Sequence, residues 1–497
     1  MSSHASVLKP AMIIMLGRVL GYAACFAIPI VLVRQFDQET FGTYKQLFLV
    51  FGTLFGLAQL GMAESLFYFV PERARRAGRY VFNAMVVLAV AGALCAAGLW
   101  IFREPVAQLM NNPQLVETLP YIGWYLLFML MASVLEIVMT ARKRHRAASA
   151  TYAVSDVLRA SLSIVPVLYF QDLRWLMGWA VAFAAARFLA AAVYVTREFG
   201  DDFRPRRMLA ARQAAYAGPF SVAVLIEMMQ SQFHLYFVSY HFDAATFAIY
   251  AIACLQIPLV EFLTSSVGNV LMVRMRELAK VSTAAVLSVW RDTVAKLGRI
   301  MFPMVGVLLV TAHDFITTLF TAEYAASVPI FMVWCLSILF AALPADCGLR
   351  VYAQNRYLIG LNIVRLVVVV TLVSPLLDRF GLIGPAAATL LALAVFKILA
   401  VKRIATLLDT TLAHALPWAS LGRTLAISAL AAVPPLLVQA GTDWSPPVSV
   451  VVSVALYGAI YAPLLLAYGG LSALECHDLI GWIARPLRLK GEAPCAE

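Results

Sequence analysis

Four arginines, Arg18, Arg159, Arg187 and Arg365, stand inside long apolar stretches of the sequence. A charged side chain is costly in such surroundings, so each one is a functional-site hypothesis by default. A guanidinium keeps its charge and can donate paired hydrogen bonds to phosphate or carboxylate oxygens. Arginines gathered in one apolar environment could replace the water around an anion. The sequence therefore predicts a cationic cavity lined by these four side chains.

Each arginine also has a structural interpretation. Asp156 precedes Arg159 by three residues, so the two share one helix face and could neutralise each other. Arg187 could pair with an acid on a neighbouring helix, and Lys397 could snorkel from the end of its span. Both interpretations stay open on the sequence alone.

Two carboxylates, Glu227 and Glu261, lie near the middle of apolar stretches. A buried carboxylate can take up a proton on one side of a membrane and release it on the other, so these residues are hypotheses for ion coupling. The alternative is an ion pair with a cavity arginine. Glu64, Glu136 and Asp346 are placed nearer the ends of their spans, where they could snorkel.

The elements that carry these charges are apolar runs of about 20 residues, long enough as helices to cross about 30 Å of hydrocarbon. Of the 497 residues, 62% are hydrophobic and 13% are charged, whereas a soluble chain carries about 25% charged residues. The composition predicts an all-α polytopic membrane protein with about fourteen spans. The expected spans are 11–33, 43–69, 80–102, 121–141, 150–170, 175–196, 217–240, 248–272, 300–320, 328–349, 357–376, 384–401, 424–440 and 448–468.

Lysines and arginines are concentrated in one set of loops, which predicts that this set and both termini face the cytoplasm of a bacterial inner membrane. The opposite set offers only Arg34, Arg103, Arg174 and Arg379. The net charge of +11 then belongs to cytoplasmic loops, and no nucleic-acid partner is expected. The longest loop, 273–299, indicates a helix on the membrane surface or a plain connector. The first apolar run lacks a cleavage signal and is expected to stay as a helix.

An internal repeat appears at an offset of 206 residues. Phe36-Asp37-x-x-Thr40-Phe41-x-x-Tyr44 recurs as Phe242-Asp243-x-x-Thr246-Phe247-x-x-Tyr250, and Arg159 falls on Arg365. The offset covers six spans, so the copies have the same orientation, as in transporters built from parallel repeats. We expect an N-terminal lobe at 1–212, a C-terminal lobe at 213–418, two further helices at 419–470 and a cytoplasmic tail at 471–497.

Several segments are similar to a known family. LGRVLGY, FDQETFGTYKQLF, AQLGMAESLFYFVPE and RFGLIGPAAA resemble the polysaccharide-export (Wzx-type O-antigen flippase) branch of the MOP superfamily. This resemblance implies two six-helix lobes around a central cavity and alternating-access transport of undecaprenyl-diphosphate-linked oligosaccharide toward the periplasm. Arg18 matches an arginine that lines the cavity in such flippases. Lipid II flippases usually carry an Arg-Asp pair there, and Arg18-Val19 departs from it.

Other functions were weighed against a flippase. A MATE-type multidrug antiporter would need an acidic cavity for organic cations. A membrane glycan polymerase or ligase would need a sizeable periplasmic loop, and the segment 103–120 is short. The chain has no G-x-x-x-x-G-K-[ST], H-E-x-x-H or G-x-S-x-G motif and no C-x-x-C pair, so neither an enzyme nor a metal or cofactor is expected. The expected partners are the lipid-linked substrate, membrane lipids and glycan-assembly enzymes such as a polymerase or glycosyltransferases.

Overall fold

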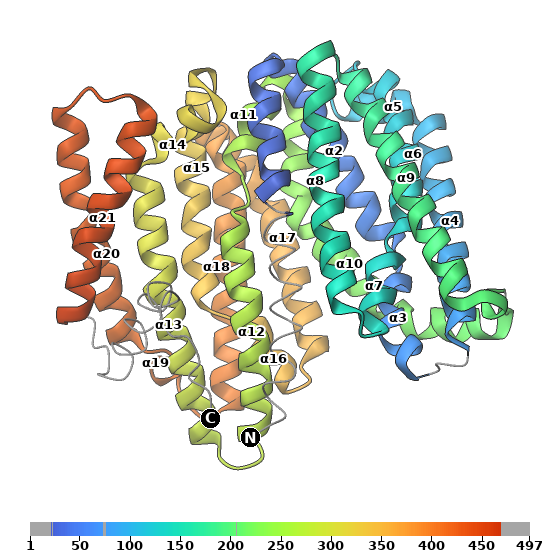
Figure 1. The fold of residues 1–497 in the computed structure, drawn as a ribbon. Helices are drawn as coiled ribbons and strands as arrows, with labels where there is room; N and C mark the ends of the chain where they lie inside the picture. The colour runs from blue at the N-terminus through green and yellow to red at the C-terminus, as the bar shows by residue number, and fades with distance from the viewer. Residues whose placement is uncertain (1–20, 22, 73–75, 205, 469–497) are drawn as a thin grey trace, which may run out of the picture. The chain divides into compact units, whose positions relative to one another are not determined.

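A computed structural model describes residues 21, 23–72, 76–204 and 206–468, and this part of the chain folds into helices without a β-strand. Ten of its helices are long and apolar enough to cross a membrane, or up to 12 if each of two broken pairs counts as one span. The expected fold class, an all-α polytopic membrane protein, is confirmed (Figure 1).

The helices follow one another with short connections. Their bounds are Ala23–Gln35, α2 Gln38–Ala58, α3 Met62–Glu72, α4 Ala77–Ile101, α5 Arg103–Leu109, α6 Leu115–Ala132, α7 Val134–Ala141, α8 His145–Phe170, α9 Leu173–Phe199, η2 Gly200–Asp202, α10 Arg207–His241, α11 Ala244–Ala253, α12 Pro258–Leu278, α13 Thr283–Val310, α14 Ala312–Phe320, η3 Ala322–Ser327, α15 Val328–Cys335, η4 Leu336–Ala342, α16 Ala345–Val351, α17 Asn355–Phe380, α18 Ile383–Leu407, α19 Leu412–Ala415, α20 Trp418–Gly441 and α21 Pro446–Tyr468. Each expected span has a helical counterpart, although only the end of the first lies in the described residues.

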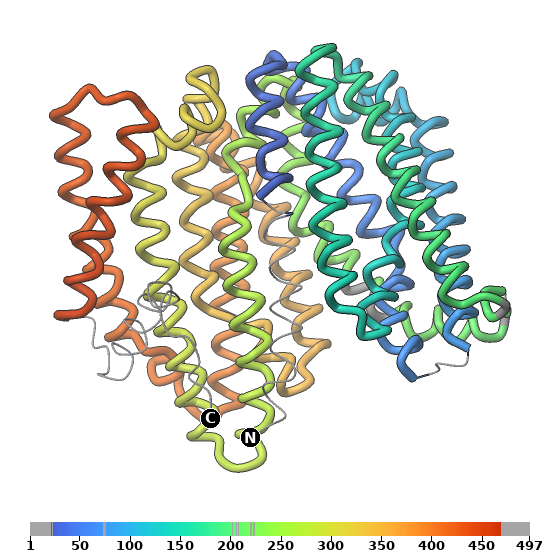
Figure 2. Tube along the Cα trace, viewed as in Figure 1, coloured from blue at the N-terminus to red at the C-terminus, as the bar shows by residue number. Residues whose placement is uncertain are grey.

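The segment 273–299 differs from the expected surface helix. α12 continues to Leu278, and α13 runs unbroken over 28 residues from Thr283 to Val310 (Figure 2). The side chain of Ser282 caps α13 by accepting a hydrogen bond from the Ala285 amide. Trp290 and neighbouring apolar residues of α13 are buried in the protein. The prediction of a separate surface helix was wrong because this apolar stripe packs against other helices rather than lipid headgroups.

The helices fall into two compact units that interleave along the chain. Unit 1 comprises the described residues up to Pro258 together with Leu319–Phe331 and Ile359–Ala392. Unit 2 comprises Leu259–Thr318, Met332–Leu358 and the described residues from Leu393 onward. The division into lobes at residue 212, which rests on the repeat, stays a prediction.

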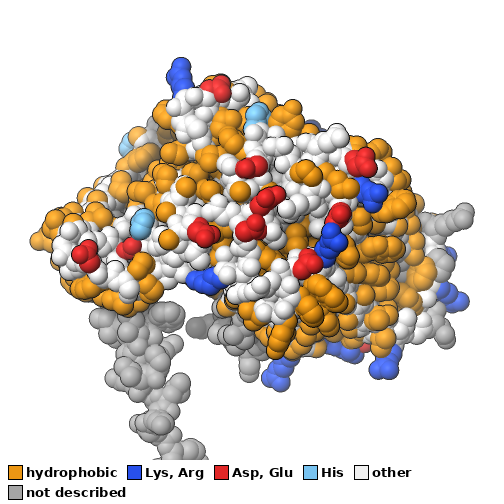
Figure 3. All heavy atoms as spheres, turned by 90° about the horizontal axis from the view of Figure 1, so that it is seen from above, with side chains coloured by type: hydrophobic (Ala, Val, Ile, Leu, Met, Phe, Trp, Pro, Cys, Tyr) orange, Lys and Arg blue, Asp and Glu red, His pale blue; other side chains and the backbone are white. Residues whose placement is uncertain are grey.

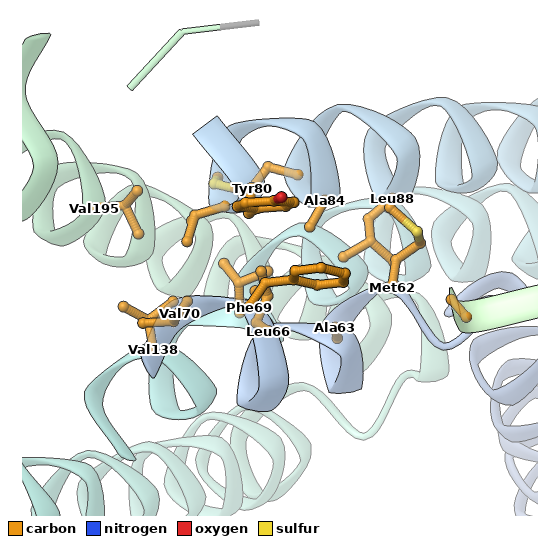
Figure 4. Close-up of a cluster of buried hydrophobic side chains, with 14 of the residues drawn as sticks. Met62, Ala63, Leu66, Phe69, Val70, Tyr80, Ala84, Leu88, Val138 and Val195 are labelled. Carbon is orange, nitrogen blue, oxygen red and sulfur yellow. The ribbon is translucent and has the colours of Figure 1, made fainter. Parts of the chain in front are cut away.

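One core of unit 1 forms where α3, α4, α7 and α9 meet (Figure 4). The rings of Phe69 on α3 and Tyr80 on α4 stack with their centroids 4.4 Å apart. Val138 of α7 and Val195 of α9 belong to the same buried cluster. This packing fixes α7 and α9, which carry two of the charged residues considered below.

The repeated motif forms the same local structure twice. Asp37 caps α2 by accepting a hydrogen bond from the Thr40 amide at 3.0 Å, and Asp243 caps α11 through the Thr246 amide at 2.9 Å. The two helices cross closely within unit 1, because a Cβ at Gly42 would lie 1.8 Å from the Ala244 carbonyl oxygen. The repeat therefore forms two capped helices that contact each other near their capped ends.

Candidate functional site

The Arg159 side chain lies in the middle of α8, between carboxylate, sulfur and phenol groups. Its Nη2 donates to Asp156 Oδ1 at 2.9 Å and to Cys25 Sγ at 2.8 Å. Gly21 allows this approach, since a Cβ there would lie 2.3 Å from Asp156 Oδ2. The helix Ala23–Gln35 and α8 are thus held together beside a guanidinium that is one third exposed, at 33%.

Aromatic rings border this guanidinium. The hydroxyl of Tyr125, on α6, lies beside Arg159 and the Tyr125 ring is buried. On α2, the rings of Phe48 and Phe51 have centroids 6.1 and 4.7 Å from that of Tyr125. A row of aromatic faces next to a charged group can contact the apolar face of a sugar as well as a lipid chain.

Arg187 on α9 forms a more deeply buried ion pair. Its Nη2 lies 2.7 Å from Glu136 Oε1 on α7, and the side chains are 14% and 2% exposed. Nη1 also donates to the Ser155 hydroxyl on α8. Glu136 therefore does not snorkel, and the prediction of an acid on a neighbouring helix is confirmed for Arg187.

The two arginines form one cluster around α8, which supplies Ser155, Asp156 and Arg159. Each guanidinium has one carboxylate partner, as the structural interpretation predicted. Both side chains keep a donor, however. The Nε atoms of Arg159 and Arg187 are buried and have no hydrogen-bond partner among the described residues. A buried donor without a partner can mark the place of an acceptor that is not part of the protein.

Arg365 occupies a different place in unit 1. It lies on α17, close enough to His234 of α10 for its charge to act on that imidazole. His234 is buried, and its Nδ1 lies 2.8 Å from the Tyr250 hydroxyl of α11. The structure thus puts Arg365 beside α10, whereas Arg159 lies on α8 and Arg187 donates to a residue of α8.

The remaining expected site residues are placed separately. Glu227 is exposed on α10 in unit 1, and Glu261 is exposed in the first turn of α12 in unit 2. The described part of the chain contains no ion pair for either carboxylate. Arg18 lies outside the described residues.

Lys397 does not snorkel, contrary to one expectation. Its Nζ is 2.9 Å from the Leu343 carbonyl oxygen and 3.4 Å from Asp346 Oδ2, and the residue is 9% exposed. Leu343 lies in the break between η4 and α16, and its carbonyl oxygen also accepts a hydrogen bond from the Ala345 amide at 2.8 Å. Lys397 is therefore held inside the protein by a backbone carbonyl and a carboxylate.

Sequence reasoning missed two features of α2. The aromatic row Tyr44, Phe48, Phe51 and Phe55 has helical spacing and could have been found from that spacing. Lys45 is partly buried, with Nζ 5.4 Å from the Phe41 ring centroid. Lys45 was overlooked because it stands near the start of the expected span 43–69, where a lysine is usually an interfacial residue.

Comparisons with known proteins give a family and a fold. Residues 7–272 match the model of the family described as "Polysaccharide biosynthesis protein". The structure is similar to the lipid II flippase MurJ in an inward closed conformation, with a TM-score of 0.74 and 11% identity over 95% of this chain and 100% of that one. A comparison with curated proteins gives no match.

Two further solved structures have the same fold. A variant of the Vibrio cholerae MATE transporter VcmN gives a TM-score of 0.58 and 13% identity, over 82% of this chain and 98% of that one. A MOP superfamily transporter from Pyrococcus furiosus gives 0.52 and 14%, over 81% and 95%.

Proposed function

Because the chain belongs to the polysaccharide biosynthesis protein family and has the fold of MOP superfamily transporters, we propose that it is a flippase for lipid-linked oligosaccharide. The substrate is an undecaprenyl-diphosphate-linked repeat unit that moves from the cytoplasmic to the periplasmic face of the inner membrane by alternating access. The product would supply a glycan polymerase, and glycosyltransferases would supply the substrate. Both termini of the protein face the cytoplasm in this proposal.

The observation that carries the proposal is the pair of unsatisfied Nε donors on Arg159 and Arg187. In a low-dielectric site such donors strongly favour an anionic acceptor. A diphosphate offers several oxygens and can accept from both guanidinium groups, while Asp156 and Glu136 hold these groups in place. The aromatic row of α2 would contact the attached sugar. We also propose that Arg18 and Arg365 line the cavity, with Arg365 beside α10 and apart from the Arg159–Arg187 cluster.

The shared fold leaves a MATE-type drug antiporter as the alternative. Organic cations need acceptors and acidic groups with free oxygens. At the Arg159–Arg187 cluster the carboxylates already face guanidinium groups, and the groups without partners are N–H donors. This chemistry favours an anion, so we prefer the flippase.

Replacing Arg159→Ala together with Arg365→Ala should abolish surface glycan while the protein still inserts. The variant loses cationic donors, which compensate for the lost hydration of a phosphate. The measurement is surface glycan in cells lacking the wild-type gene, with protein abundance in the membrane fraction as the control. Arg174→Ala, in an exposed pair with Glu117, is the matched arginine loss outside the cluster and should leave glycan unchanged. Normal glycan in the double variant would remove the cavity proposal.

Ion coupling is tested in the same system. We propose that Glu227 and Glu261 take up and release the coupling proton. In vesicles made from wild-type protein, collapse of the proton gradient should halt flipping, and Glu227→Gln with Glu261→Gln should make any residual flipping insensitive to the gradient. If wild-type transport is unaffected by collapse of the proton gradient, the proposal of proton coupling is rejected, whereas the proposed substrate is not.

A further inference from the structure

A pocket of about 590 Å³ lies within unit 2, between α13 and the beginning of α20. Its α13 wall is one helix face with residues three or four positions apart, among them Ser288, Arg291 and Arg299. The other wall runs from Pro417 to Arg423. The pocket is separate from the Arg159–Arg187 cluster, which belongs to unit 1.

The charges of the pocket are mostly positive. Three guanidinium groups, those of Arg291, Arg299 and Arg423, line it with a single carboxylate, that of Asp292. Asp292 is already engaged, because Lys296 Nζ lies 2.8 Å from its Oδ2. Arg291 and Arg423 are exposed, and neither forms an ion pair with any residue in the described part of the chain. The excess of positive charge in the pocket therefore favours binding of an anion.

Helix α20 adds backbone donors to this charge. Trp418 and Ser420 in its first turn line the pocket. The first N–H groups of a helix have no intrahelical acceptor, and here no side chain caps them. A helix beginning also carries a partial positive charge, and it binds phosphate oxygens in many proteins. Together with the arginines, this arrangement matches a phosphate group.

The two walls are held in place before any ligand binds. Trp290, fully buried on α13, donates its Nε1 hydrogen to the Ala415 carbonyl at 3.1 Å, two residues before Pro417. On one side the walls converge, since a Cβ at Gly298 would lie 2.8 Å from a methyl carbon of Leu421. The pocket thus has a fixed width, which lowers the entropic cost of binding.

The residues of the two walls have the pattern typical of a membrane boundary. Arg299 is the last charged residue of α13, and the helix continues as an apolar stretch from Ile300 to Val310. Trp418 is 54% exposed at the pocket, as expected for an aromatic residue at headgroup level. Phosphate of a membrane lipid is found at this level, and basic pockets between spans bind such headgroups.

We propose that this pocket binds the phosphate headgroup of an anionic phospholipid from the leaflet that faces the basic loops. The arginines and the first turn of α20 contact the phosphate, and the acyl chains lie along the apolar halves of α13 and α20. The proposal does not depend on which substrate the protein moves.

The test uses the full-length protein in detergent, with phosphatidylglycerol or phosphatidylcholine of identical acyl chains added and bound lipid counted by native mass spectrometry. The wild type should retain one phosphatidylglycerol in preference to phosphatidylcholine. Arg291→Gln with Arg423→Gln should lower the apparent affinity about thirtyfold, or about fivefold for each arginine. Arg356→Gln with Lys402→Gln removes the same charge from exposed positions outside the pocket and should keep the wild-type affinity.

Equal retention of both lipids, or equal loss in the two double variants, would overturn the proposal. Arg291→Lys with Arg423→Lys should recover most of the affinity, which separates lost charge from a misfolded protein. Undecaprenyl diphosphate and inorganic phosphate are tested in the same way as alternative ligands. Binding of undecaprenyl diphosphate but not phosphatidylglycerol would make the pocket a substrate site and reject the phospholipid. Equal competition by inorganic phosphate would reject a lipid ligand altogether.

Discussion

Arg187, in its buried pair with Glu136, can have both a structural and a functional role. Removing two charges from water costs several kcal/mol for each ion, and their attraction roughly repays that cost only when the pair is intact. With side chains only 14% and 2% exposed, both ions of this pair are largely removed from water. The pairing stabilises α7 against α9, yet it leaves the Arg187 Nε unsatisfied. These two roles can be separated by substitution.

Arg187→Leu should destabilise the protein by about 3–5 kcal/mol, because Glu136 stays buried without its partner. Arg187→Leu with Glu136→Leu should recover most of that loss, since no charge remains in the site. Thermal unfolding in detergent measures both. If the double variant is as unstable as the single one, the unpaired Glu136 carboxylate is not the cause of the loss. A stable double variant that exports no glycan would assign a transport role to the Arg187–Glu136 pair.

At the scale of the element, the crossing of α2 and α11 depends on a missing side chain. Gly42 brings the helix backbones together where a Cβ would lie 1.8 Å from the Ala244 carbonyl oxygen. Backbones that approach this closely gain packing contacts in a membrane, where small residues line helix interfaces. The capped beginnings of α2 and α11 are therefore fixed relative to one another within unit 1.

Gly42→Ala should destabilise the protein by about 1–3 kcal/mol, the usual cost of adding a methyl group to a full interface. Gly52→Ala is the matched control on the same helix, because nothing lies within 4 Å of its added Cβ. This control should be neutral or stabilising by up to about 1 kcal/mol through helix propensity. Midpoints of thermal unfolding compare the two variants. A Gly42→Ala protein as stable as the control would mean that α2 and α11 can separate without cost.

At the scale of the whole molecule, charge decides orientation. Figure 3 shows acidic side chains among the helix ends that are uppermost in Figure 1. Asp37 and Asp243, the caps of α2 and α11, are exposed. The loops with most lysines and arginines connect other helix ends. Under the positive-inside rule, the basic loops predict that the capped beginnings of α2 and α11 face the periplasm.

Single cysteines at Asp37 and Asp243 should react with a membrane-impermeant maleimide added to whole cells. A cysteine at Lys143, in a basic loop, should react only after the cells are opened. These positions follow from the expected six-span offset, which gives both repeat copies the same orientation. The native cysteines are removed first, and unlabelled cysteine-free protein is the background. Labelling of Lys143→Cys in intact cells would mean that the protein has the opposite orientation to the proposed one.

The sequence by itself determined that the chain spans a membrane many times, because an all-helical chain with 13% charged residues has few other ways to satisfy its backbone. The local motifs also determined the superfamily: the expected place in the polysaccharide-export branch is confirmed by the family match and the shared fold. The length of each apolar run placed the spans, because about 20 helical residues are needed to cross the hydrocarbon layer. The loop 273–299 was misjudged because an apolar stripe does not say whether protein or lipid covers it.

Only the tertiary structure decided which charges meet. That Arg159 would face Asp156 was readable from their spacing on one helix, but Cys25 and Tyr125 come from distant segments. Glu136 as the partner of Arg187, and the Leu343 carbonyl as the partner of Lys397, depend on how helices pack. The sequence gives the donors and acceptors in chain order. Which of them pair depends on donor–acceptor distances of about 3 Å between side chains of different helices, and the packing of the helices sets those distances.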